Sequence, residues 1–143
     1  TKRLRGLPDA AQGKAGRAAL RAAAVVVQKD AQARARQFDD MTTPSAIYKN
    51  IAVRYAPKIA KREGGIAFRV GVIGGAGVSK KKKSGTVLSG PGGDTRHWFY
   101  KEFGTEKQPA APFMRPALES NIDKVIEVFG SSLDAQITKQ FAK

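Results

Sequence analysis

The feature that most constrains the fold is a long alanine-rich stretch without proline, which runs from about Pro8 to Phe38. Arginine, lysine and glutamine are interspersed with the alanines, and all four residue types are strong helix formers. Pro8 suits the first turn of a helix, where an N–H group is not needed. The expected apolar face consists mostly of small side chains: Ala15, Ala19, Ala22 and Val26. The sequence therefore predicts a long basic helix that lies close to a sheet or another helix.

Shorter elements are expected after this helix. Residues 45–50 suit a short helix, and residues 51–55 fit either its continuation or a strand that ends at Pro57. Residues 66–73 give the clearest strand pattern in the chain, because every second residue is apolar. These apolar residues are Ile66, Phe68, Val70 and Val72.

The second half of the chain combines loops, aromatic residues and prolines. Residues 74–95 are rich in Gly, Ser and Lys, which predicts a long mobile basic loop. Residues 97–103 are expected to form a second strand or a short aromatic segment, with Trp98 and Tyr100 on one face and Phe99 in the core. Gly104 permits a tight turn. A proline-rich arm over residues 105–116 then leads into a C-terminal helix from about Arg115 to Ala142.

The helical stripe of this last segment is expected to be Leu118, Ile122, Val125, Phe129, Leu133, Ile137 and Phe141. A bend or interruption is expected at residues 130–132, which read Gly-Ser-Ser. Together these elements predict an α+β fold: two helices packed on a small, mainly antiparallel β-sheet. The length of 143 residues predicts a single domain over residues 1–143, with a flexible start at residues 1–8.

Composition argues against enzymatic chemistry. The chain has no cysteine and one histidine, His97, so thiolate zinc sites, cysteine nucleophiles and multi-histidine metal sites are excluded. The glycines after the predicted strand do not match a Walker phosphate loop, and Lys80 occupies the third glycine position of a dinucleotide motif. His97 near Asp94 lacks the context of a nucleophilic site. The sequence predicts no catalytic residue, no cofactor and no metal.

The net charge of +14 predicts an anionic partner: nucleic acid, an anionic membrane surface or an acidic protein. The apolar run at residues 22–27 is far too short to span a bilayer, which needs about 20 apolar residues. Four consecutive lysines, Lys80, Lys81, Lys82 and Lys83, are the most distinctive charge feature. They fit either a solvated loop or a contact with phosphates that carries no sequence specificity. Both readings stay open.

One block is distinctive enough to suggest a family. Residues 97–105 read His-Trp-Phe-Tyr-Lys-Glu-Phe-Gly-Thr, and residues 109–118 read Pro-Ala-Ala-Pro-Phe-Met-Arg-Pro-Ala-Leu. With the closing helix, this pattern resembles the neck or tail-completion proteins of long-tailed bacteriophages, the family labelled after the tenth gene product of a lambdoid coliphage. The basic first helix and the Val-Gly-Val strand at residues 70–72 agree in order. The family's Thr-Gly-x-Leu turn is replaced by Thr-Pro-Ser-Ala at residues 43–46.

The resemblance implies a virion protein without enzymatic activity. It implies a homo-oligomeric ring, six-fold by analogy, at the junction of head and tail, in contact with head-connector or stopper proteins and with tail-tube or tail-terminator proteins. It also implies a location in the virion, with assembly in the host cytoplasm and no membrane partner. Neck ring and tail terminator remain alternatives.

We expect the proline arm to project Phe113 and Met114 away from their own sheet, toward a neighbouring core groove or the next subunit, with Arg115 anchoring the arm through a carboxylate or backbone carbonyls. The predicted subunit interface is Phe103, Gly104, Thr105, Phe113, Met114 and Arg115. The alternative is an arm that packs wholly on its own subunit. The lysines at 80–83 are expected to face the DNA channel or an acidic partner. A competing hypothesis is a nucleic-acid-binding architectural protein without sequence specificity.

Overall fold

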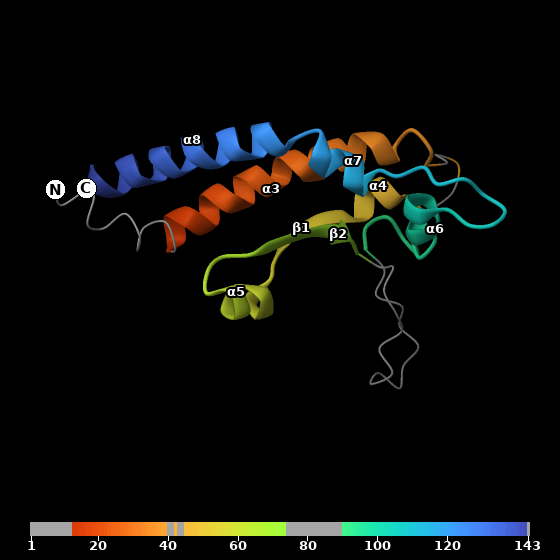
Figure 1. Cartoon of the computed structure of the whole chain (residues 1–143), viewed down its shortest axis with the longest axis horizontal. Helices are drawn as coiled ribbons and strands as arrows, with labels where there is room; N and C mark the ends of the chain where they lie inside the picture. The colour runs from red at the N-terminus through yellow and green to blue at the C-terminus, as the bar shows by residue number, and fades with distance from the viewer. Residues whose placement is uncertain (1–12, 40–41, 43–44, 74–89, 143) are drawn as a thin grey trace. The chain divides into compact units, whose positions relative to one another are not determined.

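The computed structural model describes residues 13–39, 42, 45–73 and 90–142, and the structural statements below concern these residues (Figure 1). In chain order the elements are helices α3 (Lys14–Ala35) and α4 (Ile47–Asn50), strand β1 (Ile51–Tyr55), helix α5 (Pro57–Glu63), strand β2 (Phe68–Val72), and helices α6 (Trp98–Phe103), α7 (Met114–Glu119) and α8 (Ile122–Phe141). The two strands form one antiparallel sheet. The predicted α+β class is confirmed.

The chain divides into two compact units, each built from separate stretches of sequence. The first unit comprises Thr1–Val27, Val53–Arg69 and Asn121–Lys143, and the second comprises Gln28–Ala52 and Val70–Ser120. The single domain expected over residues 1–143 stays a prediction, and the flexible start at residues 1–8 lies outside the described residues.

The long alanine-rich helix is confirmed as α3. Its buried apolar side chains recur every four residues and, apart from one valine, are alanines: Ala15, Ala19, Ala23, Val27, Ala31 and Ala35. The predicted face matches at the first two positions and then shifts by one residue, since Ala22 and Val26 are only half-buried. Small side chains at this spacing let the helix backbone come close to its neighbours.

The sheet resolves the ambiguity at residues 51–55 in favour of a strand. The N–H of Ile73 donates to the carbonyl of Asn50 at 2.8 Å, and the N–H of Ala56 donates to the carbonyl of Ala67 at 2.9 Å. These two bonds enclose residues 51–55 of β1 and residues 68–72 of β2. The two stretches have equal length, so the strands pair without a bulge. Tyr55 lies opposite Phe68, with 5.5 Å between the ring centroids.

This register gives the sheet two unlike faces, because side chains alternate along a strand. One face carries the large apolar residues: Ile51, Val53, Tyr55, Phe68, Val70 and Val72. The predicted alternation of Phe68, Val70 and Val72 is therefore confirmed. The Arg17 guanidinium lies 5.1 Å from the ring centroid of Tyr55, so this face meets α3 within the first unit.

A helix that the sequence reading missed, α5, connects the strands. The sequence predicts that Pro57 ends an element, but Pro57 occupies the first turn of α5, where its fixed φ is favourable. Gly64 ends the helix with a φ of 68°, and its N–H donates to the carbonyl of Ala60. This left-handed position favours glycine.

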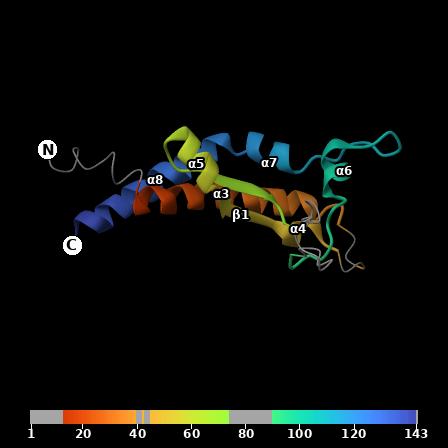
Figure 2. The same ribbon diagram turned by 90° about the horizontal axis from the view of Figure 1, so that it is seen from below.

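The predicted C-terminal helix is two helices. α7 ends at Glu119 and α8 begins at Ile122, whereas residues 130–132, where a bend was expected, lie inside an unbroken helix. There the Ser131 hydroxyl donates to the carbonyl of Glu127 at 2.9 Å without interrupting α8. Figures 1 and 2 show α8 running along the first half of α3, within the first unit.

The predicted apolar stripe is confirmed in part. Val125, Phe129, Leu133 and Ile137 are half-buried. In contrast, Leu118 is 52% exposed and Ile122 is 51% exposed, and the side chain of Phe141 lies outside the described residues. Ile126, which is not part of the predicted stripe, is 65% exposed. Among the described helices none is long and apolar enough to cross a membrane.

Candidate interaction site around α6 and the proline arm

The aromatic segment at residues 98–103 is a helix, so the expectation of a strand is wrong. The N–H of Trp98 donates to the carbonyl of Thr95 at 3.0 Å and begins the first turn. The N–H of Gly104 donates to the carbonyl of Tyr100 at 2.8 Å and closes the last one. Gly104 has a φ of 75°, as the predicted tight turn requires. The β-propensity of three consecutive aromatic residues is overridden by these local bonds.

The helical geometry turns α6 into an exposed aromatic surface. Phe99 is 53% exposed, Tyr100 56% and Phe103 50%, so the placement of Phe99 in the core is also wrong. Phe99 and Phe103 lie four residues apart on one side of the helix, with 4.6 Å between ring centroids. We call Phe99, Tyr100 and Phe103 the α6 aromatic face.

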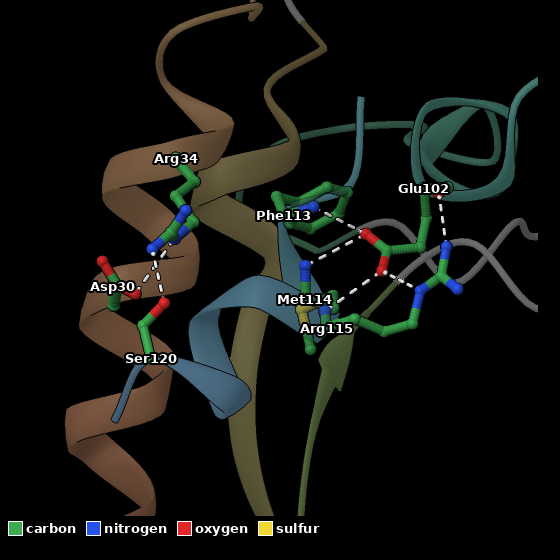
Figure 3. A network of polar contacts seen from close by, with 7 residues as sticks. All are labelled: Asp30, Arg34, Glu102, Phe113, Met114, Arg115 and Ser120. Atoms are coloured by element: carbon green, nitrogen blue, oxygen red, sulfur yellow. Dashed lines mark hydrogen bonds and ion pairs between the residues drawn. The ribbon is translucent and has the colours of Figure 1, made fainter. Parts of the chain in front are cut away.

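Next to the α6 aromatic face, the same helix carries a buried carboxylate, Glu102, which is 2% exposed (Figure 3). One of its oxygens accepts hydrogen bonds from the backbone N–H groups of Phe113 at 2.7 Å and Met114 at 3.0 Å. Its other oxygen accepts from the N–H of Arg115 at 3.1 Å and from the Arg115 Nε at 3.3 Å. Glu102 therefore caps the N-terminus of α7 and links it to α6.

Arg115 completes this link. Besides its contact with the Glu102 carboxylate, its Nη2 donates to the carbonyl oxygen of Glu102 at 3.3 Å. Its guanidinium also lies 5.0 Å from the ring centroid of Phe103. Both predicted kinds of anchor are present: Arg115 contacts the Glu102 carboxylate and also the Glu102 backbone carbonyl.

Two opposing effects act on the pKa of Glu102. Burial raises the pKa, because it disfavours the charged form. The backbone hydrogen bonds from Met114, Phe113 and Arg115, together with the Arg115 side chain, outweigh burial and hold the pKa below its usual value. Glu102 is therefore a carboxylate at neutral pH.

The arm at residues 105–112 folds back toward α6. The N–H of Thr105 donates to the carbonyl of Gln108 at 2.8 Å, which closes a turn. The N–H of Ala111 then donates to the carbonyl of Lys101 at 2.8 Å. Gly104 allows this close approach, because a Cβ there would lie 2.8 Å from the backbone nitrogen of Ala110.

Phe113 lies in the core of its own chain, which is compatible with the expected core groove and with an arm packed on its own subunit, but not with a direct contact to the next subunit. Its side chain is 0% exposed and packs against Phe38, with 5.5 Å between ring centroids. Glu102 accepts a hydrogen bond from the Phe113 N–H at 2.7 Å and holds the backbone there. Met114 is half-buried beside it.

Three of the six predicted interface residues, Phe113, Met114 and Arg115, contact Glu102, and all six lie within the second unit. Phe103, Thr105 and Arg115 are exposed, whereas Gly104 and Met114 are half-buried and Phe113 is buried. Their role as a subunit interface stays a prediction. The sequence reading missed Glu102 itself and the exposure of Phe99 and Tyr100, although a glutamate in the middle of an aromatic run was a usable signal.

A second buried polar cluster lies where the lysine-rich segment begins and ends. The Asn50 side-chain amide donates to the Gly93 carbonyl at 3.0 Å and to the Thr95 hydroxyl at 2.8 Å. Its carbonyl oxygen accepts from the N–H of Gly92 at 2.7 Å. The Thr95 hydroxyl in turn donates to the carbonyl of Ile73 at 3.2 Å.

This cluster fixes residues 90–95, which differ from the mobile loop predicted for them. Asn50 and Thr95 are both fully buried. The rest of the predicted loop, including Lys80–Lys83, lies outside the described residues. Ile73 and Thr95, described residues on either side of it, are joined by the hydrogen bond from the Thr95 hydroxyl to the carbonyl of Ile73.

Among the described residues no group of three or more His, Cys, Asp or Glu side chains could hold a metal ion.

Comparison with known proteins places the chain in a phage family. Residues 1–104 match the family model described as "Bacteriophage HK97-gp10, putative tail-component". Since this match covers most of the chain, the chain belongs to that family. The matched region includes α6 and ends at Gly104, before the proline arm. No curated protein and no solved structure matches the chain.

Proposed function

We propose that the chain is a structural virion protein that forms a ring at the head–tail junction of a long-tailed phage or a phage-like particle. The ring joins the head connector to the tail tube, and DNA passes through it. Family membership supports a structural role in the tail. The structural observation that best supports assembly into a ring is the exposed α6 aromatic face.

The α6 aromatic face has the character of an interface core. Aromatic residues are enriched at the centres of protein–protein interfaces, where they supply much of the binding free energy. Three adjacent aromatic side chains that are each at least half exposed are costly in an isolated subunit. Burial against the next subunit would remove this cost.

Glu102 prepares this surface for binding. It fixes α6 against the start of α7, so the aromatic face and the arm lose little conformational freedom on assembly. In the proposed interface Phe103, Thr105, Met114 and Arg115 make contacts, Gly104 shapes the turn, and Phe113 supports α7 from within. A surface on α6 that meets a different surface of the next subunit would generate a ring.

The test is native mass spectrometry of the purified protein, alone and with tail tubes or connector particles, over a salt series. We expect a closed oligomer, or one that appears on the particle. In the double variant Tyr100→Ala/Phe103→Ala we expect at least about tenfold weaker assembly, since two core aromatic residues are typical hot spots. The matched control is Ile122→Ala/Ile126→Ala, which also removes two exposed apolar side chains and should assemble normally.

A monomer at every concentration that ignores the particles would contradict this function. If that monomer bound duplex DNA with a steep salt dependence, the competing function of an architectural nucleic-acid-binding protein would be favoured. Equal loss of assembly in both double variants would contradict the assignment of the interface to α6.

A further inference from the structure

The sheet places two arginines directly opposite each other. The hydrogen bonds from Ile73 to Asn50 and from Ala56 to Ala67 set the register, and this register pairs Arg54 with Arg69 across the strands. Both arginines are exposed. They lie on the face opposite the large apolar residues, because Tyr55 and Phe68, their neighbours in sequence, form the ring contact on the other face.

This pairing is unfavourable in the isolated chain. Like charges directly opposite each other on a sheet are destabilising. No described carboxylate forms an ion pair with either guanidinium. An anion bound between Arg54 and Arg69 would convert this repulsion into attraction.

The surroundings leave room for such an anion. The other positions of this face within the strands are small, Ala52 and Gly71; the residues next to the strand ends, the buried Ala56 and the half-buried Ala67, are small too. The two guanidinium groups are therefore its only large side chains. The connecting helix α5 adds three exposed cations, Lys58, Lys61 and Arg62, and its one acid, Glu63, is held by Arg62 at 2.8 Å.

We propose that Arg54 and Arg69 bind the phosphate backbone of duplex DNA, and that the cations of α5 extend this contact. We call the surface formed by Arg54, Arg69 and the cations of α5 the arginine ribbon. The proposal deepens the proposed function and rests on it, because the head–tail junction is where the chain would meet DNA. It assigns the DNA contact to residues of the first unit, in addition to any contact made by Lys80–Lys83.

The chemistry favours phosphate over an acidic protein surface. The planar guanidinium binds phosphate oxygens through two parallel N–H bonds. A protein interface would need an apolar centre, and the arginine ribbon has only alanines and a glycine beside its charges. Contacts to phosphate oxygens carry no sequence information, so the proposed binding is independent of base sequence.

The experiment measures binding of a fluorescent 20-base-pair duplex by anisotropy across a salt series. The test variant is Arg54→Gln/Arg69→Gln, and the control is Lys124→Gln/Lys139→Gln, which removes the same charge from α8 of the same unit. Loss of two phosphate contacts should lower the slope of log K against log salt by about 1.8 and weaken binding about 10- to 60-fold at 0.1 M salt. The control should change binding less than about twofold, if its lysines make no phosphate contact.

Two further measurements separate a binding role from a structural one. Without DNA, Arg54→Gln/Arg69→Gln should melt at the same temperature as the unmodified chain or higher, because a like-charge pair is removed. Arg54→Lys/Arg69→Lys should keep the salt slope but bind more weakly, since lysine retains charge and loses the paired N–H geometry.

Equal DNA binding by the test and control variants would overturn the proposal. So would competition by polyglutamate that is as effective as unlabelled duplex at equal charge, which would favour an acidic protein partner. These outcomes are independent of ring formation. A chain that binds DNA through the ribbon but never assembles would contradict the ring alone, and a ring whose DNA binding ignores Arg54 and Arg69 would contradict the ribbon alone.

Discussion

Glu102 is the residue on which the candidate interface depends. A buried carboxylate is costly unless hydrogen bonds satisfy it, and here three backbone N–H groups and one guanidinium do so. These donors are the N–H groups that begin α7, which have no partner within their own helix. One side chain therefore satisfies a helix terminus and holds two elements together.

We predict that Glu102→Gln lowers the free energy of unfolding at pH 7 by about 2–4 kcal/mol, because charge-assisted hydrogen bonds are replaced by weaker ones and an amide N–H₂ faces the donors. The folded-state pKa of Glu102 is lowered, so its stabilisation is fully present above the unfolded pKa of about 4.3 and is lost as pH falls through the folded pKa. Urea unfolding from pH 7 to pH 3 should show the two proteins converging at acid pH.

Asp94→Asn is the matched control. The pKa of Asp94 is also lowered, chiefly by its side-chain hydrogen bond with Arg96, but this ion pair is exposed and local. We expect a much smaller change in stability than for Glu102→Gln. If Glu102→Gln kept the stability of the unmodified chain from pH 7 to pH 3, the capping role of Glu102 would be contradicted.

Gly92 carries a second prediction at the scale of single residues. A Cβ there would collide with the backbone carbonyl of Ala46, which lies beside the buried Asn50 cluster. We expect Gly92→Ala to lower the free energy of unfolding by about 1–3 kcal/mol, as overpacking does in other cores. Gly65→Ala is the control, since a Cβ there has nothing within 4 Å. Equal stability of the two variants in thermal unfolding would show that residues 90–95 are not held as described.

At the scale of elements, the sequence predicted those whose signal is local and repeated. The alanine-rich helix α3 and the alternation in β2 are long enough for their periods to show. The sequence predicts a strand or a short aromatic segment where α6 lies, because six residues carry no usable helical period and aromatic residues favour strands. α5 was missed because Pro57 is equally suited to end one element or to begin another.

The candidate site was predictable only in part, for a related reason. The sequence motif indicates Phe103, Gly104 and Arg115 as site residues. It does not indicate the role of Glu102, which contacts residues 11 to 13 positions further along the chain. The spacing of apolar residues in the sequence cannot predict such a contact between a side chain and distant backbone N–H groups. The burial of Phe113 likewise depends on Phe38, far away in sequence.

The α8 helix gives a prediction at this scale. Gly130 lies exposed inside α8, and a Cβ there has nothing within 4 Å. We expect Gly130→Ala to raise the free energy of unfolding by about 0.5–1 kcal/mol, because glycine is the weaker helix former. Gly64→Ala should do the opposite and cost about 1–2 kcal/mol, since its φ of 68° is unfavourable for alanine. Urea unfolding of both variants checks the pair, and destabilisation by Gly130→Ala would mean that α8 is not continuous there.

At the scale of the whole molecule, two kinds of surface respond differently to salt. The net charge of +14 makes copies of the chain repel one another, and this repulsion is screened as ionic strength rises. The α6 aromatic face is apolar, so its contribution to assembly depends little on salt. The arginine ribbon would bind DNA by releasing counterions, and added salt weakens that binding.

We therefore predict opposite salt dependences for assembly and for DNA binding. Between 0.05 and 0.3 M salt, where the Debye length falls from about 14 to about 6 Å, the fraction of oligomer should rise while the affinity for duplex DNA falls. Sedimentation velocity and anisotropy on the same samples would measure both. Tyr100→Ala/Phe103→Ala should abolish the rise in oligomer and leave the DNA curve unchanged, and Arg54→Gln/Arg69→Gln should flatten the DNA curve while the oligomer still forms. An oligomer that dissociates as salt increases would show that subunits meet through opposite charges, which would move the interface away from the α6 aromatic face.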